Sequence, residues 1–176
     1  MQNPRTAFYD AELQEGTPEL NRLGLPRPRS GSFATVYKIL SGTSNWAVRC
    51  FLHPVSDQQE RYAEVSAHLA KIRLPYLVQF SFLTQGIRAP KQTYPILKME
   101  WVEGESLIPY IEKNLANSGA LLGLAARWFE MMKSLRQSSI AHGDLQHGNV
   151  LVANGEFKLV DYDGMFVPSL RGKSSV

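Results

Sequence analysis

Only one cysteine, Cys50, occurs among the 176 residues, and no apolar run is long. A single thiol excludes an internal disulfide framework and a zinc site built from several cysteines, and it is typical of a reducing compartment. The most apolar run, Leu121–Ala126, is too short to cross a bilayer, and the first thirteen residues carry acidic side chains where a signal peptide has an apolar stretch. We therefore expect a cytoplasmic protein without a membrane partner.

Charge of one sign is scarce as well. Nineteen Lys and Arg residues stand against sixteen Asp and Glu residues, which gives a formal net charge of +3. An excess this small and this evenly spread does not form the basic footprint of a nucleic-acid-binding protein, so we expect no nucleic-acid partner. Apolar residues make up 44% of the chain, as in ordinary globular proteins, and the length fits one domain or two small lobes.

The first hundred residues predict a small β-sheet with one helix. Stretches rich in aromatic and β-branched residues indicate strands, and a polar turn between the first two indicates a hairpin. The helix is indicated by apolar residues at helical spacing after a capping box from Ser56 to Gln59. Gly86 and Pro90 mark the turn between the last two strands. The predicted strands are 32–40, 45–52, 76–83 and 94–102, and the predicted helix is 57–73.

The composition changes near Glu103, where Glu103–Glu105 interrupts the strand pattern and a helical pattern follows. Apolar residues over 121–135 recur on one stripe of a helix. We predict an α+β chain made of an N-terminal arm at 1–25, a first lobe at 26–102 and a mainly helical second lobe at 103–176.

A hairpin near the C-terminal end of the chain carries the strongest local signal. Asn154-Gly155 separates two apolar runs, and this pair favours a type I′ turn because both residues accept a positive φ. If these two residues form the turn, Asn149 comes opposite Val160. Asn149 and Asp161 are then neighbours at the open end of the hairpin.

These residues have the chemistry of a metal site beside a base. An amide oxygen and a carboxylate are hard oxygen ligands that Mg²⁺ accepts, with the remaining positions left to water and phosphate. Asp144 lies five residues before Asn149 and can accept the proton of a substrate hydroxyl. A single Asp or Asn in a loop is more often a turn former or a cap. The convergence of Asp144, Asn149 and Asp161 on one hairpin end favours a functional site.

At this point the sequence resembles a known family. His142-Gly143-Asp144-Leu145, with Asn149 behind it, resembles the catalytic loop H-R-D-L-x-x-x-N of protein kinases, and Asp161-Tyr162-Asp163 stands where they carry D-F-G. Three earlier segments are similar, in the family's order, to its glycine-rich loop, its V-A-I-K strand and the hinge between its lobes: Ser30–Lys38, Ala47–Arg49 and Met99–Leu107.

The resemblance implies a protein kinase-like fold that binds ATP and Mg²⁺ and phosphorylates Ser or Thr hydroxyls of a protein substrate, as bacterial serine/threonine kinases do. Asp144 would be the catalytic base, and Asn149 and Asp161 would hold the metal. Glu64 would pair with Arg49, with Glu60 as the alternative. The residues implied in nucleotide binding are Gly31, Val36, Ala47, Arg49, Glu64, Met99, Glu100 and Val102.

Four departures from the family's pattern keep two other functions open. Arg49 replaces a lysine with a larger planar group, and Gln146 replaces a lysine that often neutralises phosphate. Only Gly31 remains of three loop glycines. Arg49 and Gln146, together with the absence of the later helices of the second lobe, favour a pseudokinase that binds nucleotide, or merely a partner, without turnover. Gly143, in place of arginine, and Gly148 make the loop similar also to H-G-D-L-x-x-G-N of aminoglycoside and choline kinases, which suggests a small-molecule phosphotransferase.

The chain also ends earlier than the family's pattern. Only residues 162–176 follow Asp161, whereas the second lobe of kinases continues with several more helices. We therefore expect a truncated kinase-like chain. Part of the apolar face of the helix at 121–135 would then be uncovered, unless residues 1–25, a partner or a second copy of the chain covers it.

Overall fold

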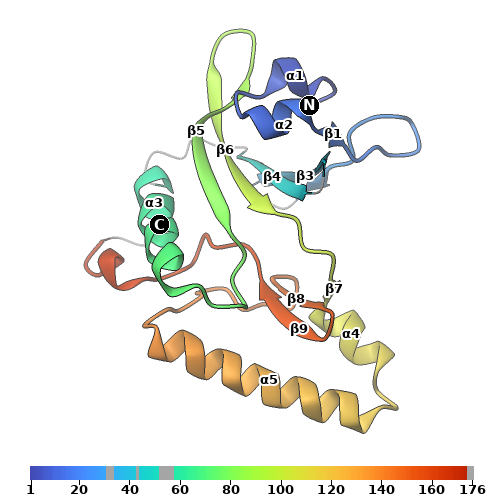
Figure 1. The fold of residues 1–176 in the computed structure, drawn as a ribbon, viewed down its shortest axis with the longest axis vertical. Helices are drawn as coiled ribbons and strands as arrows, with labels where there is room; N and C mark the ends of the chain where they lie inside the picture. The colour runs from blue at the N-terminus through green and yellow to red at the C-terminus, as the bar shows by residue number, and fades with distance from the viewer. Residues whose placement is uncertain (31–33, 43, 52–57, 174–176) are drawn as a thin grey trace. The chain divides into compact units, whose positions relative to one another are not determined.

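The structure is a computed structural model that describes residues 1–30, 34–42, 44–51 and 58–173 (Figure 1). Its fold is α+β. The chain divides into two compact units. The first unit comprises Met1–Ala63 and Gln79–Trp101, and the second comprises Glu64–Val78 and Val102–Val176. The division after Trp101 lies beside the boundary expected near Glu103, but the second unit also takes in a segment from the first half of the sequence.

An antiparallel sheet of six strands forms the first unit. Its order is β1-β3-β4-β6-β5, and β2 pairs beside β3. The predicted hairpin of the first two long strands is confirmed, because β3 and β4 pair continuously from Ala34↔Phe51 to Ser41↔Ser44. The strands are β1 (Thr17–Pro18), β2 (Arg29–Ser30), β3 (Ala34–Ser41), β4 (Ser44–Phe51), β5 (Phe80–Arg88) and β6 (Thr93–Glu100).

The last two strands differ from the prediction in their bounds. β5 begins four residues later than expected and continues through Gly86, which was predicted in the turn. An irregularity of register between Leu83 and Ile87 accommodates this residue. A Cβ at position 86 would lie 2.3 Å from Ile96 Cγ1, so a glycine is needed where the two strands approach. The turn itself is closed by a hydrogen bond from Ala89 N to Gln92 O (2.9 Å).

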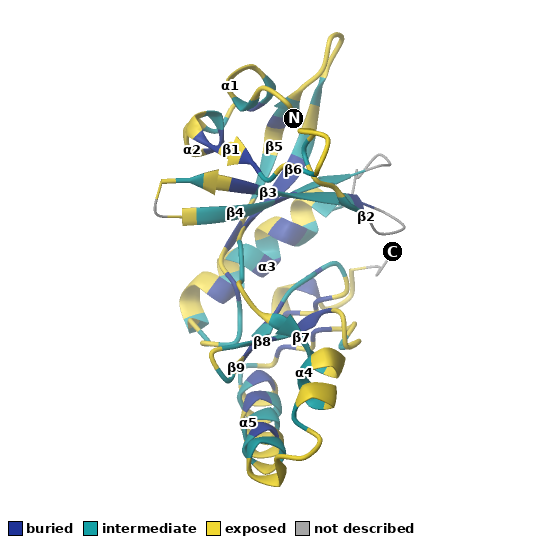
Figure 2. Ribbon diagram, turned by 90° about the vertical axis from the view of Figure 1, so that its right-hand side faces the viewer, coloured by how far each residue is buried: buried dark blue, intermediate teal, exposed yellow. Residues whose placement is uncertain are grey.

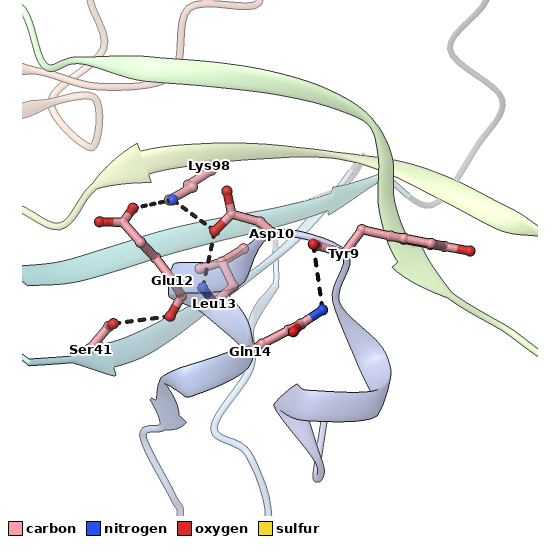
Figure 3. Close-up of polar contacts among 7 residues, drawn as sticks. All are labelled: Tyr9, Asp10, Glu12, Leu13, Gln14, Ser41 and Lys98. Atoms are coloured by element: carbon pink, nitrogen blue, oxygen red, sulfur yellow. Dashed lines mark hydrogen bonds and ion pairs between the residues drawn. The ribbon is translucent and has the colours of Figure 1, made fainter.

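The N-terminal residues, predicted as a peripheral arm, pack into the first unit. Helices α1 (Pro4–Ala7) and α2 (Ala11–Glu15) lie against one face of the sheet, where Phe8 and Leu13 are fully buried together with Ile39, Val48 and Ile96. Figure 3 shows that Lys98, on the same face, reaches the carboxylates of Asp10 and Glu12. Phe8 and Leu13 are therefore part of the core of this unit, whereas Leu20, Leu23 and Leu25 stay exposed.

The predicted helix after the hairpin is confirmed as α3 (Gln58–Ile72). Its expected capping residue, Ser56, lies outside the described residues. Tyr62 of α3 is 1% exposed and stacks on Phe82, with ring centroids 5.4 Å apart. The rings of Phe51 and Phe80 lie 6.2 Å and 5.8 Å from Tyr62, so aromatic packing fixes the start of the helix within the first unit.

The second unit combines a small antiparallel sheet with helices. The sheet order is β7-β8-β9. The elements are β7 (Glu105–Ser106), α4 (Leu107–Lys113), α5 (Ser118–Gln137), β8 (Val150–Ala153), β9 (Glu156–Leu159) and the 3₁₀ helix Pro168–Leu170. No helix in the described part of the chain is long and apolar enough to span a membrane.

The helix predicted over 121–135 is confirmed within the longer α5. Its apolar stripe is only partly as predicted: Leu124 and Leu135 are buried, whereas Ala125 is exposed and Met131 joins the buried side. Leu122 and Phe129 are 71% and 74% exposed, and Figure 2 shows exposed and buried residues along this helix. Some of the apolar surface of α5 is therefore uncovered in the isolated chain.

Candidate functional site

The β8–β9 hairpin has the predicted turn and register. Asn154 and Gly155 have φ values of 53° and 81°, the two positive values that a type I′ turn requires. Beyond the last strand pair, Val160 N donates a hydrogen bond to Asn149 O (3.0 Å). The prediction that Asn149 comes opposite Val160 is confirmed, and Asp161 is the next residue along the chain.

The side chains of Asp144 and Asn149 are in direct contact. Asn149 Nδ2 donates to Asp144 Oδ2 (2.8 Å) and to the backbone oxygen of Asp144 (3.1 Å). Gln146 Nε2 donates to the same Asp144 Oδ2 (3.0 Å). Among the described residues, no donor bonds Asp144 Oδ1 or Asn149 Oδ1. Two amides thus orient the carboxylate through one oxygen, and one carboxylate oxygen and one amide oxygen remain as acceptors.

Asn149 is buried, whereas the two other side chains of this hydrogen-bonded group are exposed. Asn149 is 8% exposed, whereas Asp144 and Gln146 are exposed. Because the amide is buried and makes two hydrogen bonds, its position is well determined. The carboxylate of Asp144 is therefore held by a buried amide and stays accessible to another molecule.

His142 supports the loop from inside the second unit. It is 1% exposed, its Nε2 donates to Val160 O (3.1 Å), and its ring meets the Tyr162 ring edge-on at 5.8 Å between centroids. Burial lowers the pKa of His142 below 6.5, although the nearby charges of Asp161 and Asp144 oppose this shift. The imidazole is thus neutral at pH 7 and braces the loop.

Gly143 has a structural reason that the sequence did not reveal. Its φ is +79°, and a Cβ there would lie 2.0 Å from the backbone oxygen of Gly164. The loop and the segment after β9 therefore pack backbone against backbone. Two hydrogen bonds between Ala141 and Phe166 (3.1 Å and 2.7 Å) close the same contact. The only signal of this contact in the sequence is that both positions, 143 and 164, are glycine.

Asp161 and Tyr162 also have features that sequence reasoning missed. Asp161 has a φ of +64°, in the left-handed region that few residues other than glycine adopt. Tyr162 is fully buried, and its hydroxyl accepts from Val78 N (2.6 Å) and donates to Leu159 O (2.8 Å). Burial raises the pKa of the Tyr162 hydroxyl far above its usual range, so it stays a proton donor. The signal in the sequence was tyrosine at the place of phenylalanine in D-F-G.

The described residues contain no group of three or more His, Cys, Asp or Glu side chains able to hold a metal ion. The predicted ligands are of another kind, one amide and one carboxylate. Asn149 is linked by its backbone oxygen to Val160, the residue before Asp161. A pair of this kind suits Mg²⁺, which keeps several waters and takes other ligands from substrate phosphates.

Several residues predicted to bind nucleotide share one face of the first unit's sheet. Val36 is the strand partner of Arg49, and Ala47 is the partner of Met99. Partners in an antiparallel pair point to the same side, as do residues two apart on one strand. Val36, Ala47, Arg49 and Met99 therefore lie on the face opposite Lys98. Gly31 lies outside the described residues.

The other predicted nucleotide-binding residues are not brought into this group. Glu64 belongs to the second unit, where its carboxylate lies 3.5 Å from Lys173 Nζ. A hydrogen bond from Ser169 and the charge of Lys173 lower the pKa of Glu64. Glu100 ends β6 and donates its N–H to Gln79 O (3.1 Å), and Val102 is the first residue of the second segment of the second unit. The pairing of Glu64 with Arg49 stays a prediction.

Taken together, the loop at 141–149 can accept a proton from a hydroxyl at Asp144 and offer an amide oxygen at Asn149 to a hard cation. The carboxylate of Asp161 follows at the end of the same hairpin. No model of a known protein family matches the sequence, and no curated protein is significantly similar to it. The interpretation of the site therefore rests on its residues and their geometry.

Proposed function

We propose that the chain is an ATP-binding, Mg²⁺-dependent phosphotransferase with a protein kinase-like fold that acts on Ser or Thr hydroxyls of proteins. Asp144 is the base for the acceptor hydroxyl, and Asn149 and Asp161 hold Mg²⁺. The observation that carries the proposal is the 2.8 Å hydrogen bond between Asn149 Nδ2 and Asp144 Oδ2, at the open end of the hairpin that leads into Asp161.

The proposed chemistry needs few groups, which fits what the second unit offers. Phosphoryl transfer is catalysed chiefly by positioning the acceptor and by stabilising charge on the phosphates. Asp144 is exposed and oriented, so its Oδ1 is open to an acceptor hydroxyl. Asn149 Oδ1 and the Asp161 carboxylate supply the ligand types that a phosphate-bound Mg²⁺ prefers.

Within the first unit, the proposal assigns nucleotide binding to residues on one face of the sheet. Val36, Ala47 and Met99 give one sheet face an apolar surface for the adenine, and Arg49 adds a positive charge to that face for the phosphates. Arg49 presents a planar fork in place of a compact ammonium, which changes the geometry of a phosphate contact. We therefore expect nucleotide binding to tolerate Arg49 better than turnover does.

A second candidate, a small-molecule phosphotransferase, is favoured by Gly143. The 2.0 Å approach that a Cβ would make to Gly164 O excludes the arginine that many protein kinases carry at this position. The loop similar to that of aminoglycoside and choline kinases has a glycine there. This observation concerns the acceptor side only, because both classes use the same base and metal.

The test is transfer of phosphate from radiolabelled ATP with Mg²⁺ to a generic protein substrate, and in parallel to a panel of aminoglycosides and choline. We expect labelled protein with the wild type and loss of at least about a hundredfold with Asp144→Ala, the size of a typical general-base contribution. Glu156→Gln, an exposed carboxylate of the same hairpin, is the matched control. Label on a small molecule alone would favour the second candidate. No label on any acceptor would contradict both.

A further inference from the structure

The hydroxyl of Tyr162 joins two backbone segments that are distant in the sequence. It accepts from Val78 N (2.6 Å), 84 residues away, and donates to Leu159 O (2.8 Å). Tyr162 and Leu159 are fully buried and Val78 is 4% exposed, so water does not readily replace these hydrogen bonds. The Tyr162 hydroxyl thus holds Tyr162 to two backbone segments, one at Val78 and one at Leu159.

Asp161 lies between Val160 and Tyr162, and hydrogen bonds hold both of these neighbours; we call the two neighbours anchors. Before it, Val160 donates its N–H to Asn149 O (3.0 Å) and accepts at its carbonyl from His142 Nε2 (3.1 Å). After it comes the anchored Tyr162. Asp161 itself has a φ of +64°, a sparsely populated conformation that persists only when the surroundings enforce it. The direction of its carboxylate depends on both anchors.

We propose that Tyr162 is a positioning residue for the metal-binding carboxylate of Asp161, and that it acts through its hydroxyl. This inference rests on the proposed function, which makes Asp161 a ligand of Mg²⁺. Phenylalanine fills the same space but leaves Val78 N–H and Leu159 O without the phenol as a partner. Asp161 can then leave the left-handed conformation, and its carboxylate loses its fixed direction.

Isothermal titration of ATP separates this role from a merely structural one, with Mg²⁺ present in one series and EDTA in the other. For Tyr162→Phe we expect affinity for ATP with Mg²⁺ to fall about tenfold, the lower end for loss of a residue that orients a metal ligand. Affinity in EDTA should change less than about twofold, because Tyr162 makes no proposed contact with the nucleotide.

The matched control is Lys158→Met. Lys158 Nζ donates to Pro75 O (2.7 Å), so this variant also breaks a hydrogen bond between β9 and the segment before Val78. It leaves the Tyr162 hydroxyl in place, and we expect both affinities to stay at the wild-type level. If Lys158→Met weakens binding with Mg²⁺ as much as Tyr162→Phe does, the effect is one of general stability and the inference is overturned.

The remaining outcomes are distinguishable. A wild type that binds ATP no better with Mg²⁺ than in EDTA overturns the proposed function and this inference with it. A wild type that shows the Mg²⁺ effect, together with Tyr162→Phe that retains it, overturns the inference alone. If Tyr162→Phe does not fold, amide exchange of Val78 in the wild type decides. Protection should rise with ATP and Mg²⁺ over ATP in EDTA, and unchanged protection overturns the inference.

Discussion

Burial determines what the imidazole of His142 contributes to stability. Because burial lowers its pKa below 6.5 in the folded state, the unfolded chain takes up a proton first as the pH falls. The free energy of unfolding should therefore decrease from about pH 6.5 downward, until the folded state is protonated as well. Above that range the residue adds no pH dependence.

We predict that His142→Gln removes this part of the pH dependence. Urea unfolding at pH 8, 7, 6 and 5 should give a smaller loss of stability toward pH 5 for the variant than for the wild type. At pH 8 the variant should be less stable by about 1 kcal/mol, because the hydrogen bond to Val160 is weakened. Identical pH profiles would show that the neutral imidazole is not what the folded loop requires.

Some residue contacts of the site follow from the sequence, and others depend on distant partners. The meeting of Asn149 with Val160 was predictable because Asn154-Gly155 fixes a type I′ turn and hence the register. The hydroxyl bond of Tyr162 was not, because Val78 is 84 residues away and offers only its backbone. The contact of Gly143 with Gly164 likewise involves no side chain that a sequence pattern records.

At the level of elements, the carboxylates of Asp10 and Glu12 tie α2 to the sheet through Lys98. Asp10 Oδ1 accepts from Leu13 N (3.0 Å), which caps the helix, and from Lys98 Nζ (2.8 Å). The Lys98 side chain is 8% exposed and also lies 4.4 Å from the Trp46 ring centroid. A lysine this buried depends on its acidic partners, so the short helix and the central strand stabilise each other.

Substitutions at Asp10 should separate the cap from the charge. We predict that Asp10→Asn, which keeps a capping oxygen, lowers the free energy of unfolding less than Asp10→Ala does. The difference should be about 1 kcal/mol, the usual value of a helix cap. Urea unfolding measures both, and Glu15→Ala, an exposed residue of the same helix, is the control. Equal losses for the two variants would contradict the capping role.

Element bounds were predictable where the pattern is long and uninterrupted. The β3–β4 hairpin and α3 agree with the sequence because their apolar spacing extends over eight or more residues. β5 does not, because its register irregularity places Gly86 inside the strand. Helices α1 and α2 span four and five residues, too short for a helical period, so no sequence pattern indicated that Phe8 and Leu13 belong to the core.

For the whole molecule, a ligand that binds only the folded state must raise the melting temperature. We predict that ATP with Mg²⁺ stabilises the wild type more than ATP in EDTA does. Asp161→Ala should abolish this Mg²⁺-dependent part of the shift, whereas Asp144→Ala should leave it largely intact, because Asp161 is assigned to the metal and Asp144 is not. Thermal denaturation with millimolar nucleotide measures the shift. Equal losses in the two variants would contradict the proposed roles.

The α+β class of the whole chain was predictable from composition and periodicity. The assignment to a protein kinase-like fold stays a prediction, since it depends on motifs such as His142–Leu145 and Asp161–Asp163 and not on the packing of either unit. Sequence periodicity also did not assign Glu64–Val78 to the second unit, because that grouping depends on contacts made after the chain returns more than eighty residues later.

The pairing of β9 with the segment after α3 determines when the second unit can fold during synthesis. The backbone of the segment after α3 is held by β9, through Leu159 N to Tyr76 O (2.8 Å) and Lys158 Nζ to Pro75 O (2.7 Å). During synthesis on the ribosome, Pro75–Val78 emerges long before β9 exists. The second unit therefore cannot be completed until the chain has been translated through β9, and Asp161 cannot reach its final conformation before that point.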